Sequence, residues 1–266
     1  MTLSTIRNNP AKQKKVKTKK QKAIAATCAV AFWLLVWHIV SLCVGSELVL
    51  VSPVKVVQTL FTVIFDPDFL KTVWYSAARI LGGFFTALTL GTVLGWVASR
   101  FWVVDTLLRP ITAVIKATPV ASFIILALVW LESRHLPFFI AALMAFPVVY
   151  RNVLEGIRGT SRELLEMARV FRVPFSRRLR GVDLPQVLPY FRAAADTALG
   201  LSWKAGTAAE VIGLCSGTIG ERLYTAKVYF QTADLFAWTA VIVLLSVLFE
   251  GLFLRGVDAL TERWCA

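Results

Sequence analysis

The chain has 266 residues, of which 57% are hydrophobic, and its mean hydropathy is +0.68. Several charge-free runs approach the roughly twenty apolar residues that span a bilayer core. This composition excludes an ordinary soluble domain and predicts an all-α polytopic membrane protein. The formal net charge of +13 raises the question of a nucleic-acid partner.

The first 22 residues are rich in lysine, from Lys12 to Lys22. In front of a spanning segment, such an arm is better explained by attraction to anionic lipid and by its effect on topology. We therefore expect 1–22 to be a cytoplasmic basic tail. Its partners would be membrane lipids, and no nucleic acid is expected.

Apolar runs predict six transmembrane helices within one domain, 23–266. The first run is longer than the core of a signal peptide and precedes no evident cleavage site, so we expect it to be retained. Ionisable residues interrupt the third, fourth and fifth runs. The predicted spans cover about 23–44, 76–99, 107–131, 136–155, 190–212 and 235–254.

The placement of lysine and arginine predicts the orientation of these spans. Six spans with an inside N-terminus put most of the 29 basic residues in the tail, the inner loops and the C-terminal end. Cytoplasmic loops carry such an excess in membrane proteins. We therefore expect a multi-pass protein of the cell membrane with both termini and the loop 160–185 in the cytoplasm.

A short amphipathic helix is predicted between the first two spans. Ser52 and Pro53 form an N-cap and first-turn pair. The apolar residues that follow share one face, which is typical of a helix at the membrane interface. They are Val54, Val57, Leu60, Phe61 and Ile64.

Small residues recur every four positions along the second span. Helices in lipid approach closely where small residues share a face, so this stripe predicts a tight helix interface. The partner helix would belong to the same subunit or to a second copy. The stripe consists of Gly83, Ala87, Gly91 and Gly95, followed by Ser99.

The loop 160–185 is polar and basic between two apolar blocks. Thr160 and Glu163 have the spacing of a capping box, which predicts the start of a short helix. Its apolar face would contain Leu164, Ala168 and Phe171. Pro174 ends this helix and favours a second one over about 174–180. The sequence therefore predicts a helix-turn-helix elbow.

This elbow resembles the EAA loop of permease subunits of binding-protein-dependent ABC importers. That loop has the pattern Glu-Ala-Ala, then Gly, then Ile-x-Leu-Pro, and here 166–168 and 182–185 match it. Arg172 stands where the family usually has its turn glycine, so we expect the elbow to turn differently here.

The resemblance covers about residues 50–255, with an order of motifs similar to the nitrate, sulfonate and taurine branch. The other matching positions are Ser52-Pro53, Ala117-Thr118-Pro119, Trp203, Ala208-Ala209-Glu210 with Gly213, and the turn 216–220. It implies a type I, MetI-like permease fold and import of a small anionic or organic solute such as nitrate, a sulfonate or taurine.

The resemblance also implies partners. ATP and Mg would be bound by a separate ABC ATPase subunit that receives the elbow, and this chain would bind no cofactor. A second permease, either a copy of this chain or a close relative, would complete the path, and an extracytoplasmic solute-binding protein would deliver the substrate. The expected coupling residues are Glu163, Glu166, Ala168, Arg169, Phe171, Leu184 and Pro185.

Ionisable residues at membrane depth usually face a cavity or a bundle interior, and the fifth span carries most of them. At about 100° per residue, one stripe of this helix forms a candidate translocation lining. The stripe contains Asp196, Gly200, Trp203, Thr207 and Glu210, with Lys204 beside it. Lys204 would attract an anionic substrate, or form an ion pair with Asp196 or a neighbouring helix that only fixes packing.

No catalytic or metal-binding grouping is evident. His38 and His135 lack neighbours at a suggestive spacing, and there is no P-loop pattern for nucleotide phosphates. The four cysteines are scattered. Cys43 and Cys215 would either form a bridge near the outer surface or remain as free thiols. We therefore do not expect an enzyme.

Two other classes of protein are considered. An ion-coupled secondary transporter would use Asp196, Lys204 and Glu210 as a relay, but no inverted internal repeat is evident. Such a transporter also has no need for a long basic elbow. A membrane-embedded enzyme is disfavoured because no nucleophile or metal-ligand grouping is present.

Overall fold

The computed structural model describes residues 19–265, and every regular element within them is a helix. These residues fall into two compact units, the first ending at Pro53 and the second beginning at Val54. Most of the predicted basic tail lies outside the described residues. The fold class expected from composition, an all-α membrane protein, is confirmed for the part that is described.

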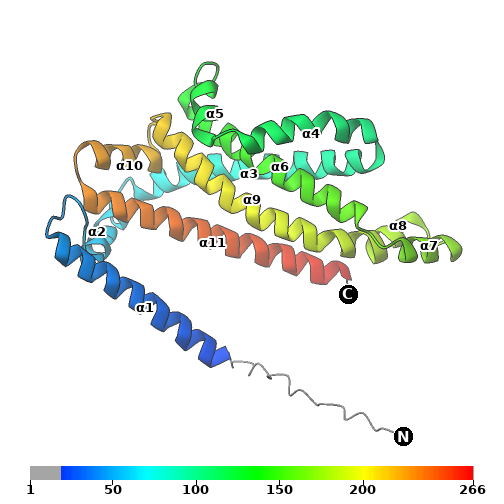
Figure 1. Cartoon of the computed structure of the whole chain (residues 1–266), viewed down its shortest axis with the longest axis horizontal. Coiled ribbons are helices and arrows are strands. Elements are labelled where there is room, and N and C mark those ends of the chain that lie inside the picture. Colours follow the sequence, from blue (N-terminus) through cyan, green and yellow to red (C-terminus); the bar gives the residue numbers. More distant parts are fainter. Residues whose placement is uncertain (1–18, 266) are drawn as a thin grey trace, which may run out of the picture. The chain divides into compact units, whose positions relative to one another are not determined.

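The first unit contains one long helix, α1 (Lys19–Val44), drawn in dark blue in Figure 1. Its segment Thr27–Val44 is long and apolar enough to cross a membrane. The helix is followed by Gly45, whose φ of 63° lies in the left-handed region that favours glycine.

The second unit contains the remaining helices. A 3-10 turn, Ser133–His135, precedes α6, and a π turn, Leu179–Asp183, joins α8 to α9. The helices are α2 (Pro53–Ile64), α3 (Phe69–Arg100), α4 (Trp102–Ala117), α5 (Val120–Ala127), α6 (Leu136–Arg158), α7 (Arg162–Val170), α8 (Phe175–Arg178), α9 (Leu184–Ile212), α10 (Ile219–Val228) and α11 (Thr232–Cys265).

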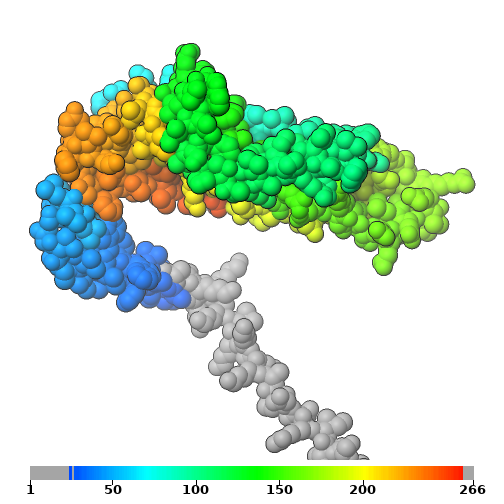
Figure 2. Space-filling model, turned by 45° about the horizontal axis from the view of Figure 1, so that its top comes forward, coloured from blue at the N-terminus to red at the C-terminus, as the bar shows by residue number. Residues whose placement is uncertain are grey.

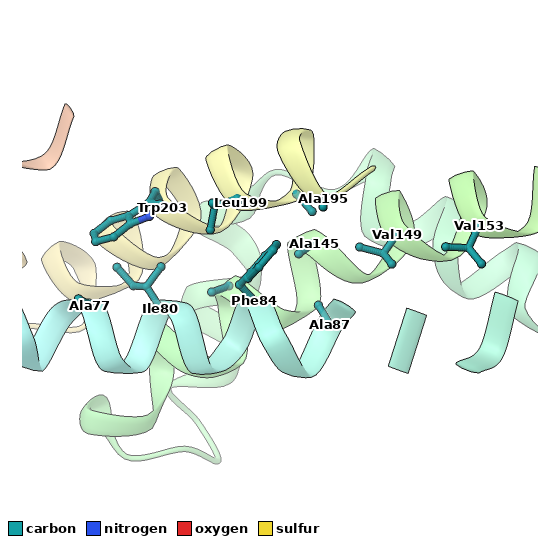
Figure 3. Packing of buried hydrophobic residues seen from close by; sticks show 12 residues of the cluster. Ala77, Ile80, Phe84, Ala87, Ala145, Val149, Val153, Ala195, Leu199 and Trp203 are labelled. Carbon is teal, nitrogen blue, oxygen red and sulfur yellow. The ribbon is translucent and has the colours of Figure 1, made fainter. Parts of the chain in front are cut away.

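The core of this unit lies between α3, α6 and α9. Figure 3 shows how Ile80 and Phe84 of α3, Ala145 of α6 and Leu199 and Trp203 of α9 point toward one another. α11 packs on this core through aromatic side chains. The ring of Phe249 stacks on that of Trp203 at 5.6 Å, and Phe253 contacts Phe84 edge-on at 5.2 Å.

The stripe of small residues on α3 faces α6 within the same chain. A Cβ atom at Gly83 would collide with the carbonyl oxygen of Phe138, and one at Gly91 would lie 2.8 Å from side-chain atoms of Val149. Only glycine permits this approach of the two backbones. Of the two interfaces considered for the stripe, the structure therefore has the one inside the subunit.

Single helices cover all the predicted spans except the third. Four helices among the described residues, α1, α3, α6 and α11, are long and apolar enough to cross a membrane. α9, with 29 residues, is also long but is not among these four. The number of six spans therefore stays a prediction.

The third predicted span, 107–131, is not one helix. α4 and α5 pass the membrane criterion only as a pair, and they are bent by 104° at the intervening residues. The cause is Pro119, because a residue before proline avoids the helical conformation. Thr118 is accordingly extended, with φ −85° and ψ 133°.

Candidate functional site

The elbow begins one residue later than the capping pattern predicts. Ser161 caps α7, since its hydroxyl accepts a hydrogen bond from the Leu164 N–H at 3.4 Å. Thr160 instead turns its hydroxyl back to the carbonyl oxygen of Gly156, at 3.5 Å. The predicted cap at Thr160 is therefore wrong. Glu163 still lies in the first turn, where a negative charge favours the helix.

The turn after α7 keeps a left-handed residue despite the arginine. Arg172 has φ 48°. Its N–H donates to the Arg169 carbonyl at 3.1 Å, and the Val173 N–H donates to the Ala168 carbonyl at 2.9 Å. This pair of bonds defines a Schellman motif, which usually contains glycine. The expected change of turn is therefore not observed, although arginine in this conformation costs roughly 1–2 kcal/mol.

The second half of the elbow runs directly into a long helix. Pro174 caps α8, and the π turn then leads into α9 without a break. The predicted second helix begins where expected, after Pro174, but its predicted end near Arg180 is wrong, because helical hydrogen bonding continues past Arg178 into α9. Leu184 and Pro185 are the first residues of α9. Any displacement of α8 therefore acts on α9 itself.

One side chain ties the two legs of the elbow together. The amide oxygen of Gln186, in the first turn of α9, accepts a hydrogen bond from the Ser161 N–H at 2.8 Å. Sequence reasoning missed Gln186 because its partner lies 25 positions earlier in the chain. The bond joins the beginning of α7 to the beginning of α9.

The predicted apolar face of α7 is divided between interior and surface. Ala168 is buried, whereas Phe171 is 75% exposed and Leu164 is 40% exposed. Other large apolar side chains of the elbow are also exposed, and the sequence analysis did not select them. With Phe171 they form what we call the elbow patch: Met167, Val170, Phe171 and Phe175. The charged residues Glu163, Glu166 and Arg169 are exposed on the same helix.

The elbow and α10 lie at opposite ends of the second unit. Figure 1 shows α7 and α8 near the beginning of α9 and α10 near its end, and Figure 2 shows the elbow projecting from the unit in yellow-green. α9 therefore connects the two ends of the unit.

A groove runs between α9 and α11. One hollow, of about 510 Å³, is lined by Trp203, Lys204 and Thr207 of α9 and by Ile242, Val243 and Ser246 of α11. A second, of about 410 Å³, lies nearer the elbow and includes Asp196. Beside it Arg192 and Asp258 join the two helices through bonds of 2.6 and 2.9 Å. Four of the six predicted lining residues thus border these hollows.

The two remaining lining residues differ from each other. Gly200 is half-buried, and no atom lies within 4 Å of the position that a Cβ would take. Glu210 is fully buried and does not border the groove. Lys204 is exposed and takes part in none of the ion pairs of the described side chains, so the packing pair with Asp196 is not formed.

Glu210 instead joins α9 to α3 and to the beginning of α10, at the end of the unit opposite the elbow. Its Oε2 accepts hydrogen bonds from the Ser76 hydroxyl at 2.9 Å and from the Gly220 N–H at 3.1 Å. The Ser76 oxygen in turn accepts one from the Ile219 N–H at 2.9 Å. Ile219 and Gly220 begin α10, so the carboxyl group of Glu210 lies at the positive end of that helix.

Cys43 of the first unit and Cys215 of the second are both free thiols in the structure. Burial raises the pKa of the Cys215 thiol to about 11, and its sulfur lies 2.8 Å from the carbonyl oxygen of Ser133. No group of three or more metal-ligating side chains gathers among the described residues.

Comparison with known protein families shows which family this chain belongs to. The sequence model of the family described as binding-protein-dependent transport system inner membrane component matches residues 87–264. The chain belongs to this family. The match includes the elbow, the groove and the turn 216–220, and it fits the all-α fold of a MetI-like ABC importer permease. The protein is an ABC transporter permease of the inner membrane.

Relatives within this family carry names that refer to anions. A candidate aliphatic sulfonates transport permease, SsuC of Bacillus subtilis (strain 168), is 27% identical over 86% of this chain and 83% of its own length. The nitrate import permease NrtB of Synechocystis is 27% identical, covering 72% of each chain. The taurine transport permease TauC of Escherichia coli (strain K12) is 26% identical over 86% of this chain and 84% of its own.

Proposed function

We propose that this permease forms half of the translocation path for a small anionic solute and that its elbow patch docks on a separate ABC ATPase subunit. The observation that carries the proposal is the exposure of Val170, the last residue of the short polar helix α7, and of Phe171 directly after it, at 77% and 75%. Large apolar side chains exposed together on such a helix mark a protein contact. ATP and Mg would be bound by the ATPase.

The docking site has the composition of an interface centre with a charged rim. The elbow patch supplies the apolar and aromatic anchors, while Glu163, Glu166 and Arg169 surround them on α7. Such rim charges chiefly set orientation and association rate, whereas buried aromatic anchors carry most of the affinity. Because the elbow continues into α9, docking would act directly on the groove.

The open side of α9 and α11 is proposed to face a second permease copy across the path. Lys204 stands in the groove without an ion pair among the described side chains, and a charged group at membrane depth normally faces a water-filled cavity. The relatives' names point to sulfonate, nitrate and taurine, which all carry an anionic group. A lysine in the path suits that shared chemistry.

The proposed orientation follows from the basic elbow. The elbow and both termini would be cytoplasmic, and α10, at the other end of the unit, would face the solute-binding protein outside. An ion-coupled relay through Asp196, Lys204 and Glu210 has less support. Glu210 is hydrogen-bonded to Ser76 and Gly220 and does not border the groove that contains Lys204.

The test compares two exposed phenylalanines at opposite ends of the unit. Phe171 and Phe230 are 75% and 74% exposed, and each follows the end of a short helix. Phe171→Asp should weaken binding of the cognate ATPase by about thirtyfold or more, since a central apolar anchor contributes about 2 kcal/mol or more. Phe230→Asp should leave this affinity unchanged. Equal ATPase affinities of the two variants would contradict the assignment of the docking face.

A further inference from the structure

A buried carboxylate lies where the elbow leaves the membrane domain. Asp105, in the first turn of α4, is 0% exposed. Its Oδ2 accepts hydrogen bonds from Nη2 of Arg109 and from Nη2 of Arg158, both at 2.9 Å, and its Oδ1 accepts one from the Tyr150 hydroxyl at 3.0 Å. A buried charge is retained at low cost only when it is fully paired in this way.

Two of the three donors connect different helices. Arg109 belongs to α4 itself, four residues after Asp105, so its ion pair stays within one helix. Tyr150 and Arg158 belong to α6, and Arg158 is the last residue of that helix. Only residues 159–161 separate Arg158 from the beginning of α7. The end of α6, from which the elbow emerges, is therefore fixed to α4.

The other end of α4 leads toward the groove. After the 104° bend, α5 packs Ile124 and Ala127 into a buried cluster with Ala205 and Ala209 of α9. Ala205 directly follows Lys204 in the chain. α4 and α5 thus form a second connection from the elbow to the groove, separate from α9.

We propose that Asp105 is a positioning residue that fixes the elbow to the bent pair α4–α5. Through the bonds to Arg158 and Tyr150, displacement of α7 by the ATPase is carried along α4 and α5 to the part of α9 beside Lys204. This inference rests on the proposed coupling function. The positioning itself is a property of this chain and is testable without the ATPase.

The two arginines provide a matched pair of variants. Both bind the same carboxylate oxygen at the same distance, and their side chains are 57% and 43% exposed for Arg109 and Arg158. Arg109→Gln and Arg158→Gln each remove one charge and one charged donor to Asp105, and Arg158→Gln also removes a long bond of 3.5 Å to the Ala98 carbonyl oxygen of α3. Only the second removes a bond between α4 and the last residue of α6, while the Tyr150 bond to Asp105 remains in both variants.

The first measurement is hydrogen exchange of residues 159–173 in the purified full-length chain in lipid nanodiscs. Arg158→Gln should speed exchange there by about tenfold, the change expected for loss of a hydrogen bond to a charged group. Arg109→Gln should not alter it, and Arg158→Lys, which retains the charge, should restore part of the protection. Equal exchange in the two Gln variants, or no recovery with Lys, would overturn the inference.

The second measurement is substrate uptake per ATP hydrolysed in the complex reconstituted with its ATPase and binding protein. Arg158→Gln should lower this ratio by about fivefold or more, within the usual range of coupling between sites. Arg109→Gln should leave it near wild type, and equal ratios would overturn the coupling role of Asp105. A wild-type complex without ATP-driven uptake would contradict the proposed function instead, while the exchange result would still decide the positioning.

Discussion

The two faces of α9 differ in whether their polar side chains are buried or exposed. Toward α3 and α10 the helix is closely packed, and Glu210 is fully buried with Ser76 and the beginning of α10. Toward α11 the helix opens onto the groove, where Lys204 is exposed and Gly200 has free space beside it. The packed face therefore holds the subunit together, and the open face is the one that we propose for solute and a second copy.

Removing the buried carboxyl of the packed face should have the largest effect on stability. Glu210→Ala leaves the Ser76 hydroxyl and the Gly220 N–H without their acceptor, and should lower the free energy of unfolding by about 2–5 kcal/mol. Thermal unfolding in detergent measures it. The control is Glu221→Ala. This variant loses the exposed hydrogen bond that the Glu221 carboxylate accepts from the Gly217 N–H, which should lower the free energy of unfolding by about 1 kcal/mol or less. Equal losses of unfolding free energy in the two variants would show that the buried bonds of Glu210 do not stabilise the fold more than an exposed bond does.

Alanine substitutions of two glycines of α9, one on each face, allow the packing of the two faces to be compared. A Cβ at Gly206 would lie 2.6 Å from Cγ1 of Ile80, whereas one at Gly200 would meet nothing within 4 Å. Gly206→Ala should therefore destabilise the protein by about 1–2 kcal/mol through overpacking. Gly200→Ala should stabilise it by up to about 1 kcal/mol, because alanine favours a helix. The same unfolding assay tests both, and a loss at Gly200 would mean that the open face is occupied within the folded subunit.

The smallest effect on stability is expected at the lysine of the open face. Lys204→Gln should change the free energy of unfolding by no more than about 0.5 kcal/mol, as expected for an exposed side chain. Uptake of an anionic substrate should nevertheless fall by about tenfold, since one hydrogen bond from a charged donor is lost. Lys227→Gln, an exposed lysine on α10, provides the same change of charge as a control. Equal uptake by the two variants would contradict the assignment of Lys204 to the translocation path.

Local sequence patterns anticipated the features that depend on neighbouring residues. The four-residue spacing from Gly83 to Gly95 predicted a close helix contact, and the contact with α6 has that character. Composition predicted the long helices, and Pro174 marked the corner of the elbow. In each case the physical cause, a missing side chain or a missing N–H, lies within a few residues of the feature.

The missed features depend on partners that are distant in sequence. Asp105 binds Tyr150 and Arg158, which follow it by 45 and 53 positions, so no local pattern indicated the cluster. The helical stripe grouped Glu210 with the groove residues, whereas the structure buries it against Ser76 of α3 and Gly220 of α10. The bend at Pro119 had a local signal, the preceding Thr118, which an apolar run of suitable length obscured.

The most direct test of the account is uptake of a radiolabelled solute with an anionic group, such as taurine or nitrate, into proteoliposomes. The purified chain is reconstituted alone, or with its cognate ATPase and solute-binding protein. Because we propose that the elbow docks on an ATPase, and the chain has no P-loop pattern of its own, uptake is expected only by the complete complex with ATP and Mg. Uptake by the chain alone, driven by an ion gradient, would contradict it and establish a secondary transporter.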